Sequence, residues 1–141
     1  MNEGFRSEYQ VREYEIDAAG GVPHAVFLNY YQQARHELLL ALRFPFRELK
    51  EAGIGFVVLR VEADYRQSLF PDEFFVIYTT MTRISKLRFR FDQTMHRKEG
   101  AVLVSTGVNI GTVVDSNNRP VMPAVLEARL TDYPIVKRAS A

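Results

Sequence analysis

One long helical pattern, over residues 24–42, constrains the fold more than any other feature of this sequence. Its apolar residues recur at spacings of three and four, which places on one helix face Phe27, Tyr31, Ala34, Leu38 and Leu42. Further leucines and valines lie outside that face, so we expect the helix to be mostly enclosed by the rest of the protein. Pro23 precedes the pattern, at a position where a missing N–H costs nothing.

Strand patterns flank this helix on both sides. Residues 8–16 before it are rich in aromatic and β-branched side chains, and four longer stretches follow at 54–66, 74–83, 86–97 and 101–114. A short second helix is predicted over 46–52. One helix cannot cross over between four successive hairpin-connected strands, so we predict an α+β fold, a curved antiparallel sheet wrapped around one central helix. The rival is a cone-shaped α+β ligand-binding fold, which usually places more helix before its sheet.

The length favours one domain. A chain of 141 residues has the size of a single domain that buries its own core. We expect an ordered core over about residues 8–130 and a loose tail after Pro134. The N-terminus lacks the charged-then-apolar layout of a signal peptide, and no apolar run is long enough to span a membrane. We therefore expect a cytoplasmic protein.

Composition excludes several classes of chemistry. The chain has no cysteine, and hence no disulfide, no cysteine-bound metal and no thiol nucleophile. Its histidines His24, His36 and His96 lack the paired spacing of metal ligands, so we expect no metal. A net charge of +1 gives no general reason to expect a nucleic acid or a membrane surface as a partner.

The segment before the helix holds the first candidate for chemistry. Asp17 ends the strand pattern, Gly20 and Gly21 form a turn, and the helix starts at about His24. Unpaired N–H groups at a helix N-terminus favour negative charge, so they can hold a carbonyl oxygen and the oxyanion that develops from it. A carboxylate beside that carbonyl can attack it or activate a water. The alternative, which the residues alone favour, is that Asp17 only caps its turn.

Two helix residues also have a functional and a structural interpretation. His24 is either a proton donor or a histidine that fixes the first helical turn. Arg35 lies among apolar residues, so we expect its charge to be partly buried and to need a partner. That partner is either an acid, such as Glu37 or one from the sheet, or a polar group at the site.

Two strand faces stand out. Alternation over 86–97 places on one face a row of basic residues, Lys86, Arg88 and Arg90. This row is either a solvated outer face of the sheet or a strip that binds phosphate. On the stretch 101–114, one face holds Ser105, Gly107 and Gly111, which leave room for something to approach the backbone.

Residues 14–28 have the sequence Tyr-Glu-Ile-Asp-Ala-Ala-Gly-Gly-Val-Pro-His-Ala-Val-Phe-Leu, and Tyr30, Tyr31, Ala34 and Arg35 follow in the helix. This segment resembles the hot-dog-fold acyl-CoA thioesterases, specifically the 4-hydroxybenzoyl-CoA thioesterase and YbgC-like branch. Asp17 and His24 stand seven residues apart, as in that family. Weaker similarities at 61–65, 71–72 and 115–123 extend the resemblance over about residues 8–130.

The resemblance implies the hot-dog fold, a five- or six-stranded antiparallel sheet around the central helix. It also implies a homodimer or homotetramer with the active site between protomers. Asp17 would match the family's catalytic carboxylate, acting as nucleophile or as base for water, and His24 would match a second catalytic position. The helix start, Val22, His24 and Ala25, would match the segment that binds the oxyanion.

The resemblance assigns supporting roles to other residues. Arg35 matches an arginine that some related polyketide thioesterases need when their Asp is replaced, and Tyr31 lies near it in the matching segment. Lys86, Arg88 and Arg90 would meet the phosphates of coenzyme A, which is part of the substrate, and no bound cofactor is implied. Two departures, Pro23 for an aromatic residue or His and Val26 for Asn or Ser, make the site less polar.

We therefore predict a thioester hydrolase that cleaves acyl-CoA to the free acid and CoA. Two alternatives stay open. One is a thioesterase acting on acyl carrier protein in polyketide or lipid synthesis, and the other is a non-catalytic acyl-thioester binding protein on the same fold. A related-fold dehydratase fits less well, because no histidine followed by a proline-rich loop is present.

Overall fold

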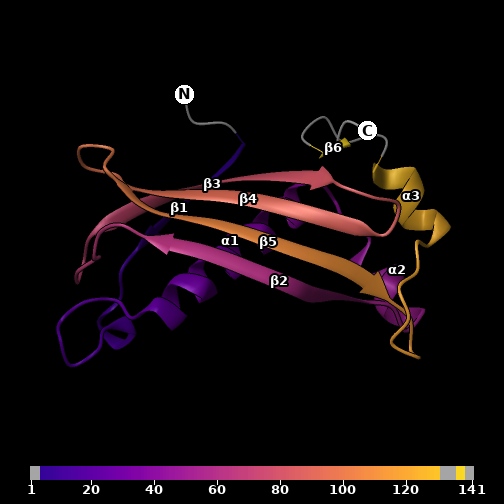
Figure 1. Ribbon diagram of the computed structural model, residues 1–141, viewed down its shortest axis with the longest axis horizontal. Helices are drawn as coiled ribbons and strands as arrows, with labels where there is room; N and C mark the ends of the chain where they lie inside the picture. The colour runs from indigo at the N-terminus through magenta and orange to yellow at the C-terminus, as the bar shows by residue number, and fades with distance from the viewer. Residues whose placement is uncertain (1–3, 131–135, 139–141) are drawn as a thin grey trace.

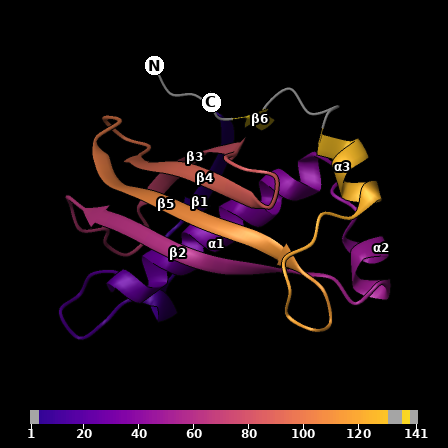
Figure 2. The same cartoon turned by 45° about the vertical axis from the view of Figure 1, so that its right-hand side comes forward.

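A curved six-stranded sheet wraps over one central helix in the computed structural model, which describes residues 4–130 and 136–138 (Figures 1 and 2). The strands are β1 (Phe5–Gln10), β2 (Gly55–Tyr65), β3 (Phe74–Arg83), β4 (Arg88–Arg97), β5 (Leu103–Val114) and β6 (Val136–Arg138). Their order in the sheet is β1-β3-β4-β5-β2, and β6 pairs with β3. All pairings are antiparallel except that between β3 and β6. The predicted α+β architecture is thus confirmed.

Helix α1 (His24–Ala41) begins after Pro23 and matches the predicted helix closely. The residues that it buries are Phe27, Tyr30, Tyr31, Ala34, Leu38 and Leu39. Helix α2 (Phe46–Glu51) follows Pro45, as predicted. Figure 1 places α2 at one end of the sheet and the loop that precedes α1 at the other.

The sheet has an inner face against α1 and an outer face. On β4, Phe89, Phe91, Gln93 and Met95 are buried on the inner face, whereas Arg88, Arg90, Asp92 and Thr94 are more exposed on the outer face. This division follows from the two-residue period of a strand. The β2 edge strand has a register shift between Val58 and Arg60 and is mostly exposed along its length.

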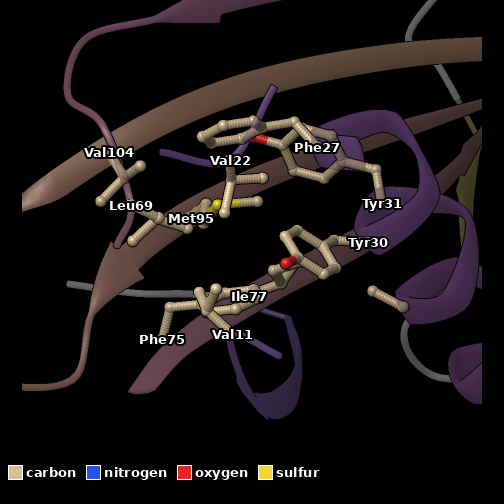
Figure 3. Close-up of a cluster of buried hydrophobic side chains, with 11 residues drawn as sticks. Val11, Val22, Phe27, Tyr30, Tyr31, Leu69, Phe75, Ile77, Met95 and Val104 are labelled. Carbon is tan, nitrogen blue, oxygen red and sulfur yellow. The ribbon is translucent and has the colours of Figure 1, made fainter. Parts of the chain in front are cut away.

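Aromatic residues of α1 fill the space between helix and sheet (Figure 3). Phe27, Tyr30 and Tyr31 project from the helix toward Met95 and Ile77 of the sheet. Phe75 lies with its ring centroid 4.7 Å from that of Tyr30. Burying side chains of this size supplies most of the stabilisation of such a core, at roughly 1.5–3 kcal/mol each.

Three parts of the chain differ from the sequence-based expectation. The stretch 8–16 is not one strand, because β1 ends at Gln10 and a short 3₁₀ helix, η1 (Glu13–Glu15), precedes Asp17. Helix α3 (Ala124–Leu130) was not predicted. Of the tail after Pro134, Val136–Arg138 form β6 and the remainder lies outside the described residues.

None of the helices in the described ranges combines the length and apolarity required to span a membrane.

Candidate active site

Asp17 lies in a tight exposed turn between η1 and α1. Its Oδ1 accepts a hydrogen bond from the Ala19 N–H at 2.9 Å. The turn is closed by the Asp17 N–H, which donates to the Gly21 carbonyl oxygen at 3.0 Å, and by Gly20, whose φ is +88°. A positive φ costs glycine little, which is why glycine serves at this position. Within one chain, the Asp17 carboxylate therefore caps its own turn.

The first turn of α1 leaves backbone donors available. Pro23 at the N-cap offers no side-chain acceptor, and the Val26 N–H donates to the Pro23 carbonyl oxygen at 3.0 Å. Across the described residues, the N–H groups of His24 and Ala25 have no hydrogen-bond partner. Such orphan donors at a helix N-terminus are suited to an oxyanion. Val22, which we expected to belong to this segment, is not available as a donor because its N–H donates to the Leu69 carbonyl oxygen.

A cleft of about 400 Å³ opens beside this helix start. His24, Phe27 and Tyr65 line it, and the loop that follows β2 completes its wall. The His24 ring is exposed and lies 6.4 Å from the Tyr65 ring, with an interplanar angle of 71°. Asp17 is not among the residues that line this cleft, so the described part of one chain does not bring Asp17 and His24 together there.

Arg35 lies deeper along α1, in a polar cluster on the inner face of the sheet. Its Nη1 donates to Gln93 Oε1 at 3.1 Å. Gln93 Nε2 in turn donates to the Tyr31 carbonyl oxygen at 3.0 Å and to Thr79 Oγ1 at 3.1 Å. Burial lowers the pKa of Arg35 to about 10 because water is kept from the cation. Among the described residues Arg35 has no acidic partner, and Glu37, which we expected in that role, instead accepts a hydrogen bond from the Tyr9 hydroxyl.

Tyr31 is buried between α1 and β5. Its hydroxyl donates to Ser105 Oγ at 2.7 Å, and burial raises the pKa of the Tyr31 phenol. The Tyr31 ring packs directly on Gly107, where an added Cβ would lie 3.2 Å from the ring. The expected close approach to the glycine face of β5 is thus made by Tyr31.

The basic row lies on the other side of the sheet. Arg88 and Arg90 are on the outer face of β4, and Lys86 is in the turn before that strand. Arg90 forms an ion pair with Asp92, with 3.0 Å between Nη2 and Oδ1. These three residues do not border the cleft at His24, and their expected contact with phosphate remains a prediction.

Sequence reasoning missed two inner-face residues, Gln93 and Asn109, that line the same hollow as Arg35. A polar residue that interrupts an apolar strand face was the available signal for Gln93, and the two flanking glycines were the signal for Asn109. Within the described ranges, no group of three or more His, Asp or Glu side chains is placed to hold a metal ion.

Comparisons with known proteins match this architecture. The sequence model of the Thioesterase-like superfamily matches residues 11–130. An acyl-acyl carrier protein thioesterase of Arabidopsis thaliana is 25% identical, over 94% of this chain and 70% of the relative. The acyl-CoA thioesterase YbgC of Haemophilus influenzae is 29% identical, over 69% of this chain and 72% of the relative.

The solved structures agree. The 1,4-dihydroxy-2-naphthoyl-CoA thioesterase of Synechocystis superposes with a TM-score of 0.83 at 19% identity, over 92% of this chain and 98% of that one. Such a likeness shows a shared fold. Since the family match covers most of the sequence, this chain belongs to the Thioesterase-like superfamily and has the hot-dog fold.

Proposed function

We propose that this protein hydrolyses acyl thioesters, with coenzyme A as the leaving thiol, and that Asp17 drives the attack on the carbonyl carbon. Membership of the Thioesterase-like superfamily supports the reaction class. The observation that supports the site is that the N–H groups of His24 and Ala25 have no partner in the described chain. His24 lines a cleft, and the exposed Asp17 carboxylate precedes it by seven residues.

The helix start serves as the oxyanion site in this proposal. The thioester carbonyl oxygen accepts hydrogen bonds from the His24 and Ala25 N–H groups. These groups lie at the positive end of the α1 dipole, which also favours negative charge on that oxygen. As the carbonyl becomes tetrahedral, its oxygen gains negative charge and these hydrogen bonds strengthen. One such donor is typically worth about 3–4 kcal/mol in the transition state.

Asp17 has two routes to the same products. As a nucleophile it adds to the carbonyl carbon, the thiolate leaves, and water hydrolyses the resulting anhydride. As a general base it takes a proton from water, the hydroxide adds to the carbonyl carbon, and the tetrahedral intermediate expels the thiolate. His24, whose exposed ring lies at the cleft, would supply a proton to the departing sulfur.

The proposal places the complete site between two copies of the chain. In one chain Asp17 does not line the cleft at His24, so a carboxylate from a second copy would complete it. Exposed apolar side chains lie at the cleft and beside it: Tyr65 lines the cleft, and Leu28, Val58 and Val61 line the hollow between α1 and β2. Exposed apolar surface of this kind favours association. We therefore propose a homodimer or a homotetramer.

A thioesterase specific for acyl carrier protein is the second candidate. The observation that favours it is the Arabidopsis relative, which acts on acyl carrier protein by its name and matches 94% of this chain. Hydrolysis of carrier-bound acyl groups, with none of acyl-CoA, would support that candidate instead.

A panel of acyl-CoA esters, assayed for the free thiol, tests the proposal. We expect wild type to release CoA and Asp17→Asn to lose nearly all of the rate. Asp72→Asn is the matched control, since Asp72 is also an exposed turn aspartate but lies away from the cleft. A wild type that cleaves nothing, or an Asp17→Asn variant as fast as Asp72→Asn, would overturn the mechanism.

A further inference from the structure

A seam between α1 and β2 begins at Leu28, the residue after Phe27 of the cleft at His24, and continues along the helix. Two hollows lie along it, of about 200 Å³ and 470 Å³. The first is bordered by Leu28 and Val61, and the second by Leu39 and Phe56. The two hollows share Gln32, Arg35, Val58 and Asn109, so Arg35 stands at their junction.

Arg35 is a partly buried cation, and no counterion meets it within the described residues. In the part of the chain that the structure describes it forms no ion pair, and the neutral Gln93 amide is its one hydrogen-bond partner. Glu62 also lines the first hollow, but it pairs with Arg60 and not with Arg35. The Arg60 Nε donates a hydrogen bond to Glu62 Oε1 at 2.9 Å. A cation removed from water is costly unless an anion meets it, so this arrangement is complementary to an anionic ligand.

The surroundings orient Arg35 toward the seam. Gln93 is 2% exposed, and its Oε1 accepts the hydrogen bond from the Arg35 guanidinium. Its Nε2 donates to the Tyr31 carbonyl oxygen and to Thr79 Oγ1, so the Gln93 amide is fixed in this orientation. Asn109 is 4% exposed and lines both hollows. Its side-chain amide has no hydrogen-bond partner within the described ranges. An arginine and an amide at one junction supply the donors that a carboxylate needs.

We propose that the α1–β2 seam binds acyl groups that end in a carboxylate, and that Arg35, held by Gln93 and assisted by Asn109, pairs with that carboxylate. This assignment rests on the proposed thioesterase function, because it takes the thioester carbonyl to lie at the α1 N-terminus. The substrate class is then the thioester of a dicarboxylic acid, bound with its free carboxylate at the junction.

The spacing along α1 sets the length of the acyl chain. Arg35 follows His24 by eleven residues, a rise of about 16 Å. Side chains on a helix lean toward its N-terminus, so the guanidinium lies somewhat nearer to His24 than its Cα does. The apolar walls between them, which include Leu28, Val58 and Val61, suit the methylene groups of a medium-length chain.

The decisive experiment compares two thioesters with the same number of carbons, sebacoyl-CoA and decanoyl-CoA, which differ at the far end of the chain. We expect wild type to favour sebacoyl-CoA in kcat/KM by about tenfold or more. In Arg35→Met we expect this ratio to fall to about one or below. Arg47→Met is the control, since it removes an equal charge from an exposed site, and it should keep the wild-type ratio.

A binding measurement separates this inference from the proposed function. Free sebacate should raise the thermal midpoint of wild type and of Arg47→Met more than decanoate does, and Arg35→Met should lose that difference. Wild type that cleaves decanoyl-CoA at least as well as sebacoyl-CoA would overturn the carboxylate site while leaving the thioesterase intact. If no acyl-CoA is cleaved, the proposed function fails, and the shift of the thermal midpoint by sebacate alone tests the carboxylate site. A shift in wild type that is lost in Arg35→Met would support the site. The absence of a shift in wild type would overturn the site.

Discussion

The hydroxyl of Tyr30 donates to Glu15 Oε1 at 2.8 Å, and this bond ties α1 to the turn that carries Asp17. The same Oε1 atom also accepts from the Arg12 N–H at 2.8 Å, which closes η1. Tyr30 itself is buried in the core, 5% exposed. The rigid core of the protein therefore holds the segment just before Asp17, although Asp17 is exposed.

Tyr30→Phe should loosen this segment. The ring would still fill the core, so the change removes only the hydroxyl, and we expect the free energy of unfolding to fall by about 1 kcal/mol. Urea denaturation measures that loss. Amide hydrogen exchange at residues 13–21 should become faster, because η1 would lose its tie to α1.

Tyr14→Phe is the control for this prediction. Tyr14 is next to Glu15 but is 79% exposed, so its hydroxyl can be removed without loss of a core contact. If Tyr14→Phe and Tyr30→Phe change stability and exchange equally, the bond to Glu15 does not hold the turn.

Most regular elements were predictable from the sequence because each has a clear hydrophobic period. The pattern over 74–83 gives β3 (Phe74–Arg83) with both ends correct, and the helix pattern over 24–42 differs from α1 by one residue. The inner and outer faces of β4 were also predictable, since strand alternation assigns them.

Local hydrogen bonding could not be predicted in the same way. Tyr14 and Ile16 fit a strand by composition, yet Glu15 caps η1 through its side chain, and the chain leaves the sheet at Gln10. The partner of Arg35 was missed for a related reason. Gln93 is distant in sequence, and only the fold brings its amide to the helix.

Gly107 keeps the space that the Tyr31 ring occupies. In Gly107→Ala the new methyl group would press on a ring whose hydroxyl is fixed by Ser105, so either the ring moves or that bond breaks. We expect a loss of about 1–3 kcal/mol in the free energy of unfolding. Gly55→Ala is the comparison, because nothing in the described chain lies within 4 Å of a Cβ at Gly55. Equal stability of the two variants in thermal unfolding would contradict this account.

The buried Arg83 attaches α3 to the sheet. Its Nη1 and Nη2 donate to the two carboxylate oxygens of Glu127 at 2.9 and 2.6 Å, and the Arg83 side chain is 4% exposed. Glu127→Ala would leave this cation largely unpaired, so we expect a loss of about 3 kcal/mol in chemical denaturation. The exposed pair of Arg47 and Glu51 offers the contrast, and Glu51→Ala should change stability little. A small effect at Glu127 would mean that water reaches Arg83.

His96 should make stability depend on pH. Its Nδ1 is buried without a partner in the described chain, its ring lies 6.1 Å from that of Tyr78, and burial lowers the pKa of this imidazole. The unfolded chain therefore binds a proton at His96 more readily than the folded chain does. The free energy of unfolding is highest above the ordinary histidine pKa of about 6.5 and decreases as the pH falls below that value. Urea denaturation at a series of pH values should show a shallower fall in His96→Gln. In His36→Gln, where an exposed ring is removed, the wild-type fall should remain, and a His96→Gln variant with that same fall would show that another group is responsible.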